Sequence, residues 1–278
     1  MKNLLAISSS YRSRGNGETL LALCEKFLPE SEFLTEKLYL KDLNIKNCTG
    51  CMKCAINKQF CHLEDDLKTV TDKILVCDFL LISSPVYFLG AASIIKTVND
   101  RLLMMNNIID YSQRKPAGII ITAGREGWEG LSVQNISILL LTLGFNIKDI
   151  LIAYGQGPSE VLMDENIESK TKIFTNRIID ANYKVSNLSD RCPVCFGNNF
   201  NILDHSSVKC PVCNLTGKIP DYKDNKTLIL FSESDINNSR WSEKILKDHM
   251  ENWIAGSGQR YKEKVKEILK RRKQLLGN

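Results

Sequence analysis

Short apolar runs alternate with longer amphipathic segments through residues 1–185. The apolar runs have the length of strands and lie at Asn3–Ser8, Phe33–Leu40, Phe79–Ser83, Gly118–Ala123 and Asn146–Ala153. The segments with helical spacing lie at Asn16–Phe27, Asp65–Cys77, Ala91–Asn106, Leu131–Leu143 and Glu165–Tyr183. Because each strand is followed by a helix, the pattern predicts a parallel sheet with helices on both faces.

Five consecutive strand–helix units are typical of a doubly wound α/β fold, and we predict the flavodoxin-like strand order 2-1-3-4-5. In that topology, ligands bind outside the carboxyl ends of the strands, where the first and third strands lie side by side. We therefore look for functional residues first in the loops that follow the strands.

The chain after residue 185 lacks this alternation. The polar residues Ser186–Asp190 are typical of a linker, and a strand is expected at Thr227–Phe231. Two amphipathic helices are expected at about Ser242–Trp253 and Arg260–Leu276, with a break at Gly256–Gly258. The units that we predict are residues 1–185, 190–232 and 233–278.

Composition and charge restrict the class of protein. Hydrophobic residues make up 43% of the 278, which suits a large buried core. No apolar run approaches the ~18 residues of a membrane helix. The apolar part of Met1–Ser10 is too short for a signal peptide, so we expect a cytoplasmic protein. Residues 259–278 carry eight Lys or Arg and two Glu, a charge of +6, so the rest of the chain, at −1, is near neutral and the tail accounts for the net charge of +5.

Four of the ten cysteines lie within fourteen residues, with the spacing C-x2-C-x2-C-x6-C. They are Cys48, Cys51, Cys54 and Cys61. Iron–sulfur clusters are held by four thiolates, and such close spacing lets one loop surround a [4Fe–4S] cluster. Zinc sites more often use two separated pairs. The spacing favours a cluster, with zinc, a redox disulfide or free thiols as the alternatives.

A second group of four cysteines forms two C-P-x-C turns. Its members are Cys192, Cys195, Cys210 and Cys213. Two reverse turns that each supply two thiolates are typical of a zinc ribbon, in which the zinc ion holds a small module together. A single iron ion, bound as in rubredoxin, is the alternative. The remaining Cys24 and Cys77 lie in apolar stretches and are expected to be buried, unreactive thiols.

The loop after the first strand, Ser8–Thr19, combines hydroxyls, glycines and a helix N-terminus. Free N–H groups at a helix N-terminus bind anions, and Arg12 adds a charge for a phosphate; a solvated turn is the alternative. The loop resembles the G-S-x-R-x-x-G-N-S/T phosphate loop of the NAD(P)H-dependent FMN reductases and iron–sulfur flavoproteins. The matching residues are Ser10, Arg12, Gly15 and Asn16. Ser9 replaces the family's glycine, and Gly17 replaces its Ser or Thr.

Two later loops resemble the flavin-binding segments of that family. Ser83–Gly90 follows the third strand and Ala123–Trp128 follows the fourth. Proline and aromatic residues at a sheet edge offer a platform for a flavin ring, and small residues allow close approach of the backbone. The resemblance implies FMN contacts at Ser10, Arg12, Asn16, Gly17, Glu18, Pro85, Val86, Tyr87, Phe88, Gly124 and Gly127. A hydrophobic turn that packs on the next helix is the alternative for the Ser83–Gly90 loop.

The first cysteine group also resembles the compact motif of the iron–sulfur flavoproteins, and all four ligand positions of the family are filled. The resemblance covers about residues 1–185. It implies a flavin-dependent oxidoreductase that passes electrons between a [4Fe–4S] cluster and FMN, with the chemistry carried by FMN and not by a catalytic side chain. It further implies a homodimer or homotetramer, with NAD(P)H or ferredoxin as the electron donor.

Two other functions stay open. One is an NAD(P)H-dependent FMN or quinone reductase whose cysteines hold no cluster. The other is a zinc-ribbon regulatory or nucleic-acid-binding flavoprotein. The basic tail would suit nucleic-acid binding. However, the spacing of its apolar residues indicates an amphipathic helix; these residues are Val265, Ile268, Leu269 and Leu276. This favours packing against a partner or subunit over binding to nucleic acid.

Overall fold

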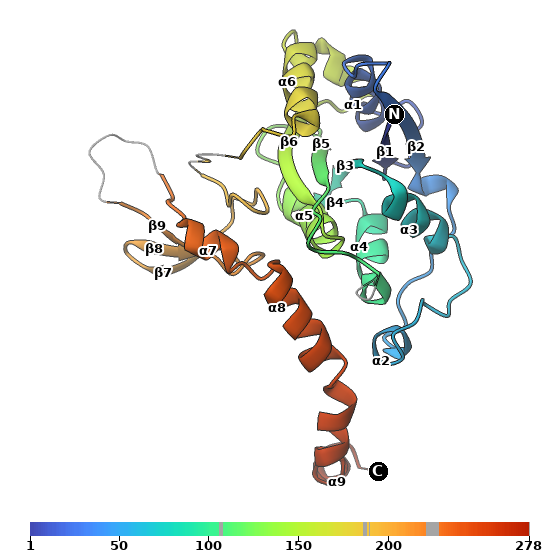
Figure 1. Ribbon diagram of the computed structural model, residues 1–278, viewed down its shortest axis with the longest axis vertical. Coiled ribbons are helices and arrows are strands. Elements are labelled where there is room, and N and C mark those ends of the chain that lie inside the picture. The colour runs from blue at the N-terminus through green and yellow to red at the C-terminus, as the bar shows by residue number, and fades with distance from the viewer. Residues whose placement is uncertain (106–107, 186–187, 189, 221–227, 278) are drawn as a thin grey trace.

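A parallel sheet with the order β2-β1-β3-β5-β6 forms the centre of the computed structural model (Figure 1). The structure describes residues 1–105, 108–185, 188, 190–220 and 228–277. The parallel strands are β1 (Lys2–Ser8), β2 (Phe33–Tyr39), β3 (Phe79–Tyr87), β5 (Pro116–Ala123) and β6 (Asn146–Tyr154). This confirms the predicted α/β class and the strand order 2-1-3-4-5. The short β4 (Gly90–Ala91), which pairs antiparallel with the end of β3, was not predicted.

Helices cover both faces of the sheet because successive strand residues point to opposite sides. Leu4 and Ala6 of β1 pack in one apolar cluster with α1 (Asn16–Lys26) and α6 (Ile167–Ile179). Residues 5 and 7 of the same strand belong to the other cluster. The helices of that face are α3 (Leu67–Val76), α4 (Ser93–Asn99) and α5 (Ser132–Thr142).

The helix expected over Ala91–Asn106 is shorter than predicted. Gly90–Ala91 belongs to β4, α4 ends at Asn99, and a separate turn of 3-10 helix, η2, covers Leu102–Met105. Asn106 lies outside the described residues. The interruption coincides with Arg101, whose side chain is buried in an ion pair with Asp65. This contact with a distant residue overrides the local helical pattern.

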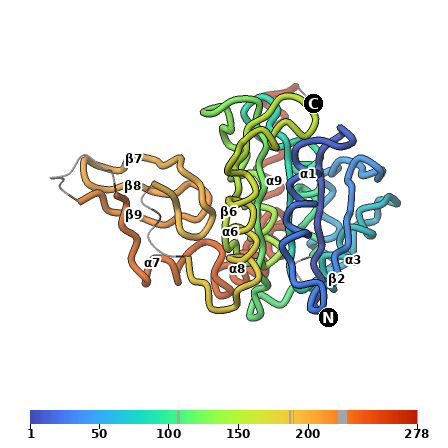
Figure 2. Tube along the Cα trace, turned by 90° about the horizontal axis from the view of Figure 1, so that it is seen from above, coloured from blue at the N-terminus to red at the C-terminus, as the bar shows by residue number. Residues whose placement is uncertain are grey.

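The second cysteine group lies in turns next to a small antiparallel sheet, which stands beside the main body (Figure 2). Its strands are β7 (Asn201–Asp204), β8 (Ser207–Lys209) and β9 (Thr216–Lys218). The strand predicted at Thr227–Phe231 is wrong in extent: Leu230 makes a single bridge to Lys218, and Thr227 lies outside the described residues. The linker expected at Ser186–Asp190 also lies largely outside them.

This small sheet packs on α5. Ser137 Oγ donates a hydrogen bond of 2.6 Å to the carbonyl of Cys195, and Gly197 lies against Gln134. The buried residues of the module belong to the same apolar cluster as those of α5. The division into units 1–185, 190–232 and 233–278 stays a prediction, but the first two share one core.

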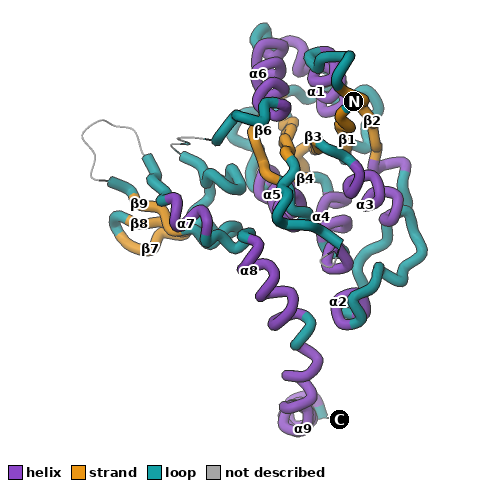
Figure 3. The backbone as a smooth tube through the Cα atoms, in the orientation of Figure 1, coloured by secondary structure: helices purple, strands orange, loops and turns teal. Residues whose placement is uncertain are grey.

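The C-terminal residues form an arm that leaves the body (Figures 1 and 3). α7 (Glu233–Asn237) lies beside the small sheet (Figure 1), and the arm consists of α8 (Glu243–Asp248), whose Leu246 still belongs to the main apolar cluster, the π-helical turn η4 (His249–Ile254) and α9 (Ser257–Leu276). The predicted break at Gly256–Gly258 is therefore shorter than expected, because α9 already begins at Ser257. No side chain of α9 is buried among the described residues. None of the described helices is long and apolar enough to cross a membrane.

Candidate functional site

A cavity of about 370 Å³ lies among the loops that follow β1, β3, β5 and β6. Eight of the predicted FMN contacts line it: Ser10, Arg12, Asn16, Gly17, Pro85, Val86, Tyr87 and Gly124. The lining residues that sequence reasoning did not assign to a site are Gly15, Thr122, Gly155, Gln156, Gly157 and Pro158. Their position after strand ends in a doubly wound sheet is the signal that would have found them.

The first turn of α1 faces this cavity. Its N-cap, Gly15, has an extended backbone, and no side-chain hydrogen bond caps the helix among the described residues. The first N–H groups of such a helix attract an anion. The guanidinium of Arg12 adds positive charge at the same wall. The chemistry of these groups fits the phosphate of FMN.

Arg12 and Asn16 also connect the phosphate loop to the segment after β6. Arg12 Nη1 donates to the carbonyl of Gln156 at 2.8 Å. Asn16 Nδ2 donates to the carbonyl of Gly155 at 2.8 Å, and Asn16 Oδ1 accepts from the N–H of Val161 at 3.2 Å. Because both polar atoms of the Asn16 amide are engaged, this side chain holds the two loops together. Its predicted contact with the phosphate stays a prediction.

Glu18, another predicted FMN contact, lies beside the cavity and not in its wall. Its carboxylate accepts hydrogen bonds from the N–H of Arg14 at 2.7 Å and from the hydroxyl of Tyr39 at 3.2 Å. Arg14 has a left-handed backbone with φ of 55°. In this structure Glu18 therefore fixes the bend of the phosphate loop.

A second cavity of about 420 Å³ adjoins the first and is mostly apolar. It is lined by Val86, Tyr87, Phe88, Leu89, Ala123, Gly124, Arg125, Trp128 and Gln156. Four of these residues also line the first cavity, so the two spaces are continuous. The shape and lining suit a flat ring attached to a phosphorylated chain. Gly127, which was predicted to contact FMN, lines neither cavity.

The loop between β3 and β4 carries strain at this second cavity. Phe88 and Leu89 have left-handed backbones, with φ of 48° and 63°. Side chains with a Cβ rarely adopt this conformation, and such strain tends to occur at functional sites. The Phe88 side chain is fully exposed, and Trp128 is 59% exposed. The structure thus presents aromatic side chains at the mouth of the cavity.

The first cysteine group lies on the loop between η1 (Leu40–Asp42) and α3, around the single turn α2 (Lys53–Ile56). Its backbone takes the left-handed conformation at Gly50, Met52 and Lys58. The N–H of Gly50 donates to Cys48 Sγ at 3.4 Å. Backbone N–H donation to thiolate sulfur is typical of loops that hold iron–sulfur clusters.

The pKa of Cys54 is affected both by burial and by the other three cysteines of this loop. Among the described residues, four sulfur atoms that all lie within 4.8 Å of one another occur in the second cysteine group and not in this one. Burial raises the pKa of Cys54, and the neighbouring thiolates of Cys61, Cys51 and Cys48 raise it further. By contrast, the N–H of Lys53 donates to Cys51 and lowers the pKa of that exposed thiol. Four thiols on one loop are the donor set that a [4Fe–4S] cluster requires.

A buried ion pair closes the base of the cysteine loop. The side chains of Arg101 and Asp65 are each 1% exposed, and Arg101 Nη1 donates to Asp65 and, at 3.1 Å, to the carbonyl of Lys46. The N–H of Lys46 donates to Asp65 Oδ2 at 2.7 Å. Burial alone would raise the pKa of Asp65, but the hydrogen bonds from Arg101 and the backbone outweigh it and lower that pKa. The two ends of the loop are thereby tied to the end of α4.

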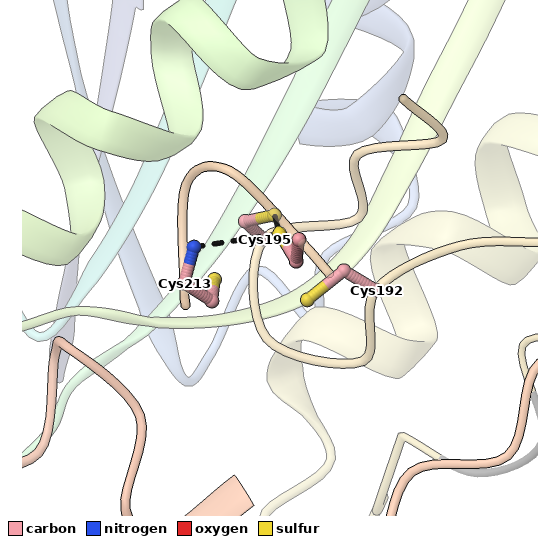
Figure 4. A group of neighbouring side chains, drawn as sticks. Cys192, Cys195 and Cys213 are labelled. Carbon is pink, nitrogen blue, oxygen red and sulfur yellow. Dashed lines mark hydrogen bonds between the residues drawn. The ribbon is translucent and has the colours of Figure 1, made fainter. Parts of the chain in front are cut away.

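The second cysteine group forms a compact, buried site of four thiols (Figure 4). Their sulfur atoms all lie within 4.8 Å of one another, and Cys195 Sγ and Cys210 Sγ are 3.6 Å apart. Four sulfurs at 2.3 Å from a shared ion lie about 3.8 Å apart in a tetrahedron. Hydrogen bonds from Cys192, Cys195 and Cys213 lower the pKa of Cys210. The spacing suits a single tetrahedral metal ion.

Comparisons with known proteins place most of these residues in one family. Residues 2–155 match the NADPH-dependent FMN reductase family. An iron–sulfur flavoprotein of Archaeoglobus fulgidus is 30% identical over 120 residues, which are 43% of this chain and 54% of that protein. The chain thus spans about half the length of this relative. A second iron–sulfur flavoprotein of that organism is 27% identical over 203 residues, which are 67% of this chain and 98% of that protein.

A solved structure titled flavone reductase shares the fold, with a TM-score of 0.70 at 18% identity. The superposition covers 94% of this chain and 92% of that one, so the likeness extends beyond the central sheet. The family match includes the phosphate loop, the ring loops and the first cysteine group. The predicted family of iron–sulfur flavoproteins and NAD(P)H-dependent FMN reductases, which are flavin-dependent oxidoreductases, is therefore confirmed. This chain belongs to the NADPH-dependent FMN reductase family and is similar to iron–sulfur flavoproteins.

Proposed function

We propose that the protein is an iron–sulfur flavoprotein that passes electrons between FMN, bound in the two adjoining cavities, and a [4Fe–4S] cluster. The cluster ligands are Cys48, Cys51, Cys54 and Cys61. The observation that carries this proposal is the connection between the two sites. Lys41 Nζ, just before the cysteine loop, donates to Ser13 Oγ of the phosphate loop at 2.8 Å. The segment from which the cysteine loop starts is therefore bonded to the loop proposed to bind the FMN phosphate.

The residues of the chain have distinct tasks in this function. The first turn of α1 and the guanidinium of Arg12 neutralise the phosphate. The Pro85–Tyr87 backbone and Gly124 flank the ring, and Phe88 and Trp128 limit access of water to it. When bound, FMN supplies the ability to accept two electrons and release them singly. No side chain of the site has to act as a general acid or base.

Anaerobic purification tests this function. We expect FMN together with about four irons and four sulfides per chain. Cys54→Ala should lose the iron and keep the FMN, because Cys54 belongs to the cysteine loop and lines neither cavity. Cys77→Ala is the matched control, since this thiol is buried beside α3 and outside both cysteine groups. Flavin without iron in the wild-type protein would contradict the proposal.

A second candidate function is NAD(P)H-dependent reduction of a flat aromatic acceptor such as a quinone or flavone. The observation in its favour is the open, apolar second cavity with Tyr87, Phe88 and Trp128 around it. The solved structure with a TM-score of 0.70 is titled flavone reductase. Stopped-flow reduction of the flavin by NADPH separates the candidates. Rapid bleaching and turnover with menadione in Cys54→Ala would favour this reductase over electron transfer through a cluster.

For the second cysteine group we propose a zinc ion with a structural role. The thiols are buried and their spacing suits one tetrahedral ion. One zinc per chain is expected by elemental analysis after the cluster has been removed. A visible absorption band of iron–thiolate charge transfer that persists in Cys54→Ala would favour a mononuclear iron site instead.

We also propose that the chain forms a homodimer or homotetramer in the cytoplasm, with NAD(P)H or ferredoxin as the donor. The exposed side chains of Phe88, Leu89 and Trp128 and the unpacked helix α9 leave apolar surface for a second copy. Reduced thiols in both cysteine groups suit a reducing compartment. Sedimentation equilibrium of the full chain and of a variant ending at Gly256 measures the contribution of α9. A monomer at micromolar concentration would contradict the assembly.

A further inference from the structure

Arg101 has more hydrogen-bond donors than the described chain can satisfy. Its side chain is 1% exposed, and Nη1 serves both Asp65 and the carbonyl of Lys46. Nε and Nη2 are buried and have no hydrogen-bond partner in the part of the chain that the structure describes. An unsatisfied buried donor costs about 1–3 kcal/mol, and more for a charged group. Two such donors on one guanidinium indicate acceptors that belong to a ligand.

The position of Arg101 identifies those acceptors as sulfur. The guanidinium lies at the base of the cysteine loop and interacts with Cys61, one of the four thiols. Asp65, which neutralises its charge, is four residues after Cys61. Both groups that anchor the guanidinium therefore come from the two ends of the loop. Of the four thiols, Cys61 is the one that interacts with this guanidinium, so sulfur is the acceptor that the loop offers to the remaining donors.

We propose that Arg101 donates hydrogen bonds from Nε and Nη2 to sulfur atoms of the iron–sulfur cluster and thereby raises its reduction potential. This inference rests on the proposed function of the first cysteine group. Hydrogen bonds to cluster sulfur and nearby positive charge stabilise the reduced form, which carries one more electron, more than the oxidised form. Arg101 acts as a positioning residue in this role, because it holds the loop and adjusts the cluster without exchanging electrons.

The test compares two variants with a control. Arg101→Lys keeps the charge beside Asp65 but loses the planar set of donors. The double variant Asp65→Asn, Arg101→Gln removes both charges together, so no unpaired buried charge is left to unfold the protein. Arg114→Lys is the matched control: Arg114 is partly buried and donates to the carbonyl of Trp241, far along the chain from the cysteine loop.

The cluster potential is measured by an EPR-monitored redox titration of the anaerobically purified full chain. We expect both variants to make the one-electron reduction at least tenfold less favourable, which is a shift of about 59 mV to lower potential, while the control and the FMN potential stay unchanged. Pulsed EPR of the reduced wild type in H2O and D2O should detect exchangeable protons at the cluster that disappear in Arg101→Lys.

The possible results distinguish a failure of the role proposed for Arg101 from a failure of the proposed function. An unchanged potential at full iron content would overturn the inference and leave the proposed function intact. Loss of iron in both variants would show that Arg101 only holds the loop, and this would overturn the inference as well. A wild-type protein without iron would overturn both, and that result is read from the wild type alone.

Discussion

Replacing Gly17 with alanine tests whether the close packing of α1 on β3 positions the phosphate site. A Cβ at residue 17 would lie under 3.0 Å from Ser83 Oγ, a separation that real Cβ atoms essentially never show. The next atom, Ser83 Cβ, would be 3.4 Å away, which is ordinary contact. The hydroxyl of Ser83 is therefore the whole obstacle to a side chain at this position.

The magnitude follows from how this overlap can be relieved. Ser83 is fully buried, so its hydroxyl has little space to move into, and the first turn of α1 must shift toward the cavity. Overpacking of this kind costs about 1–3 kcal/mol. If the overlap is relieved by a shift of α1, the N–H groups of its first turn are turned away from the phosphate, and FMN binds more weakly. At 1.4 kcal/mol per factor of ten, the expected loss is about 10- to 100-fold in Kd.

Titration of the flavin-free protein with FMN, followed by quenching of flavin fluorescence, measures the effect. The double variant Gly17→Ala, Ser83→Ala should recover most of the affinity, because only the contact at 3.4 Å remains. Gly258→Ala is the control, since a Cβ there meets no heavy atom of the described chain within 4 Å. Wild-type affinity in Gly17→Ala, or failure of the double variant to recover, would refute the reasoning.

The remaining predictions concern buried thiols, backbone strain and the second metal group. Burial raises the pKa of Cys24 and Cys77 to about 12 from 9.0, so the unfolded chain loses these protons first as pH rises. The free energy of unfolding should fall by about 1.4 kcal/mol per pH unit for each of the two thiols between about pH 9 and 12. In Cys24→Ala, the free energy of unfolding measured in urea should therefore fall less steeply with pH than in the wild type. Phe88→Gly places a residue without a Cβ at a left-handed backbone position and should stabilise the chain by about 1 kcal/mol in thermal unfolding. The same variant should slow flavin reduction. An unchanged unfolding midpoint would contradict the inference that the backbone of Phe88 is strained. Cys213→Ser should release the proposed zinc ion and cost about 3–5 kcal/mol, because it leaves three buried thiolates without their ion; unchanged metal content would exclude Cys213 as a ligand.

The parts of the fold that the sequence predicted well are those with strong local patterns. The apolar run Gly118–Ala123 lies within β5 and is buried throughout, and the alternation of strands and helices allows few topologies. The strands of the small sheet were missed because they are short and lack an apolar period; Asn201–Asp204 is exposed along its length. The helix expected over Ala91–Asn106 failed for another reason. Its interruption depends on the ion pair between Arg101 and Asp65, which no local pattern reveals.

The same distinction applies to the candidate site. Residues such as Ser10 and Pro85 were found because they lie at the carboxyl ends of strands and resemble a known motif, although β3 extends to Tyr87 and Pro85 is part of it and not of a loop. The role of the Asn16 amide could not be predicted, because its partners, Gly155 and Val161, are about 140 residues away in the sequence. Sequence patterns thus identify which loops surround the ligand. The hydrogen bonds between those loops depend on the completed sheet.

The two cysteine groups differ in the physical surroundings that their proposed metals require. The four thiols of the second group are buried in the main apolar cluster, where a redox-inert ion serves stability. In the first group, Cys48 and Cys51 are exposed, while Cys54 and Cys61 are partly buried, and Cys61 interacts with the guanidinium of Arg101. A cluster held there has one side open to a redox partner and another in contact with fixed positive charge. Electron exchange needs the open side, and control of the potential needs the buried one.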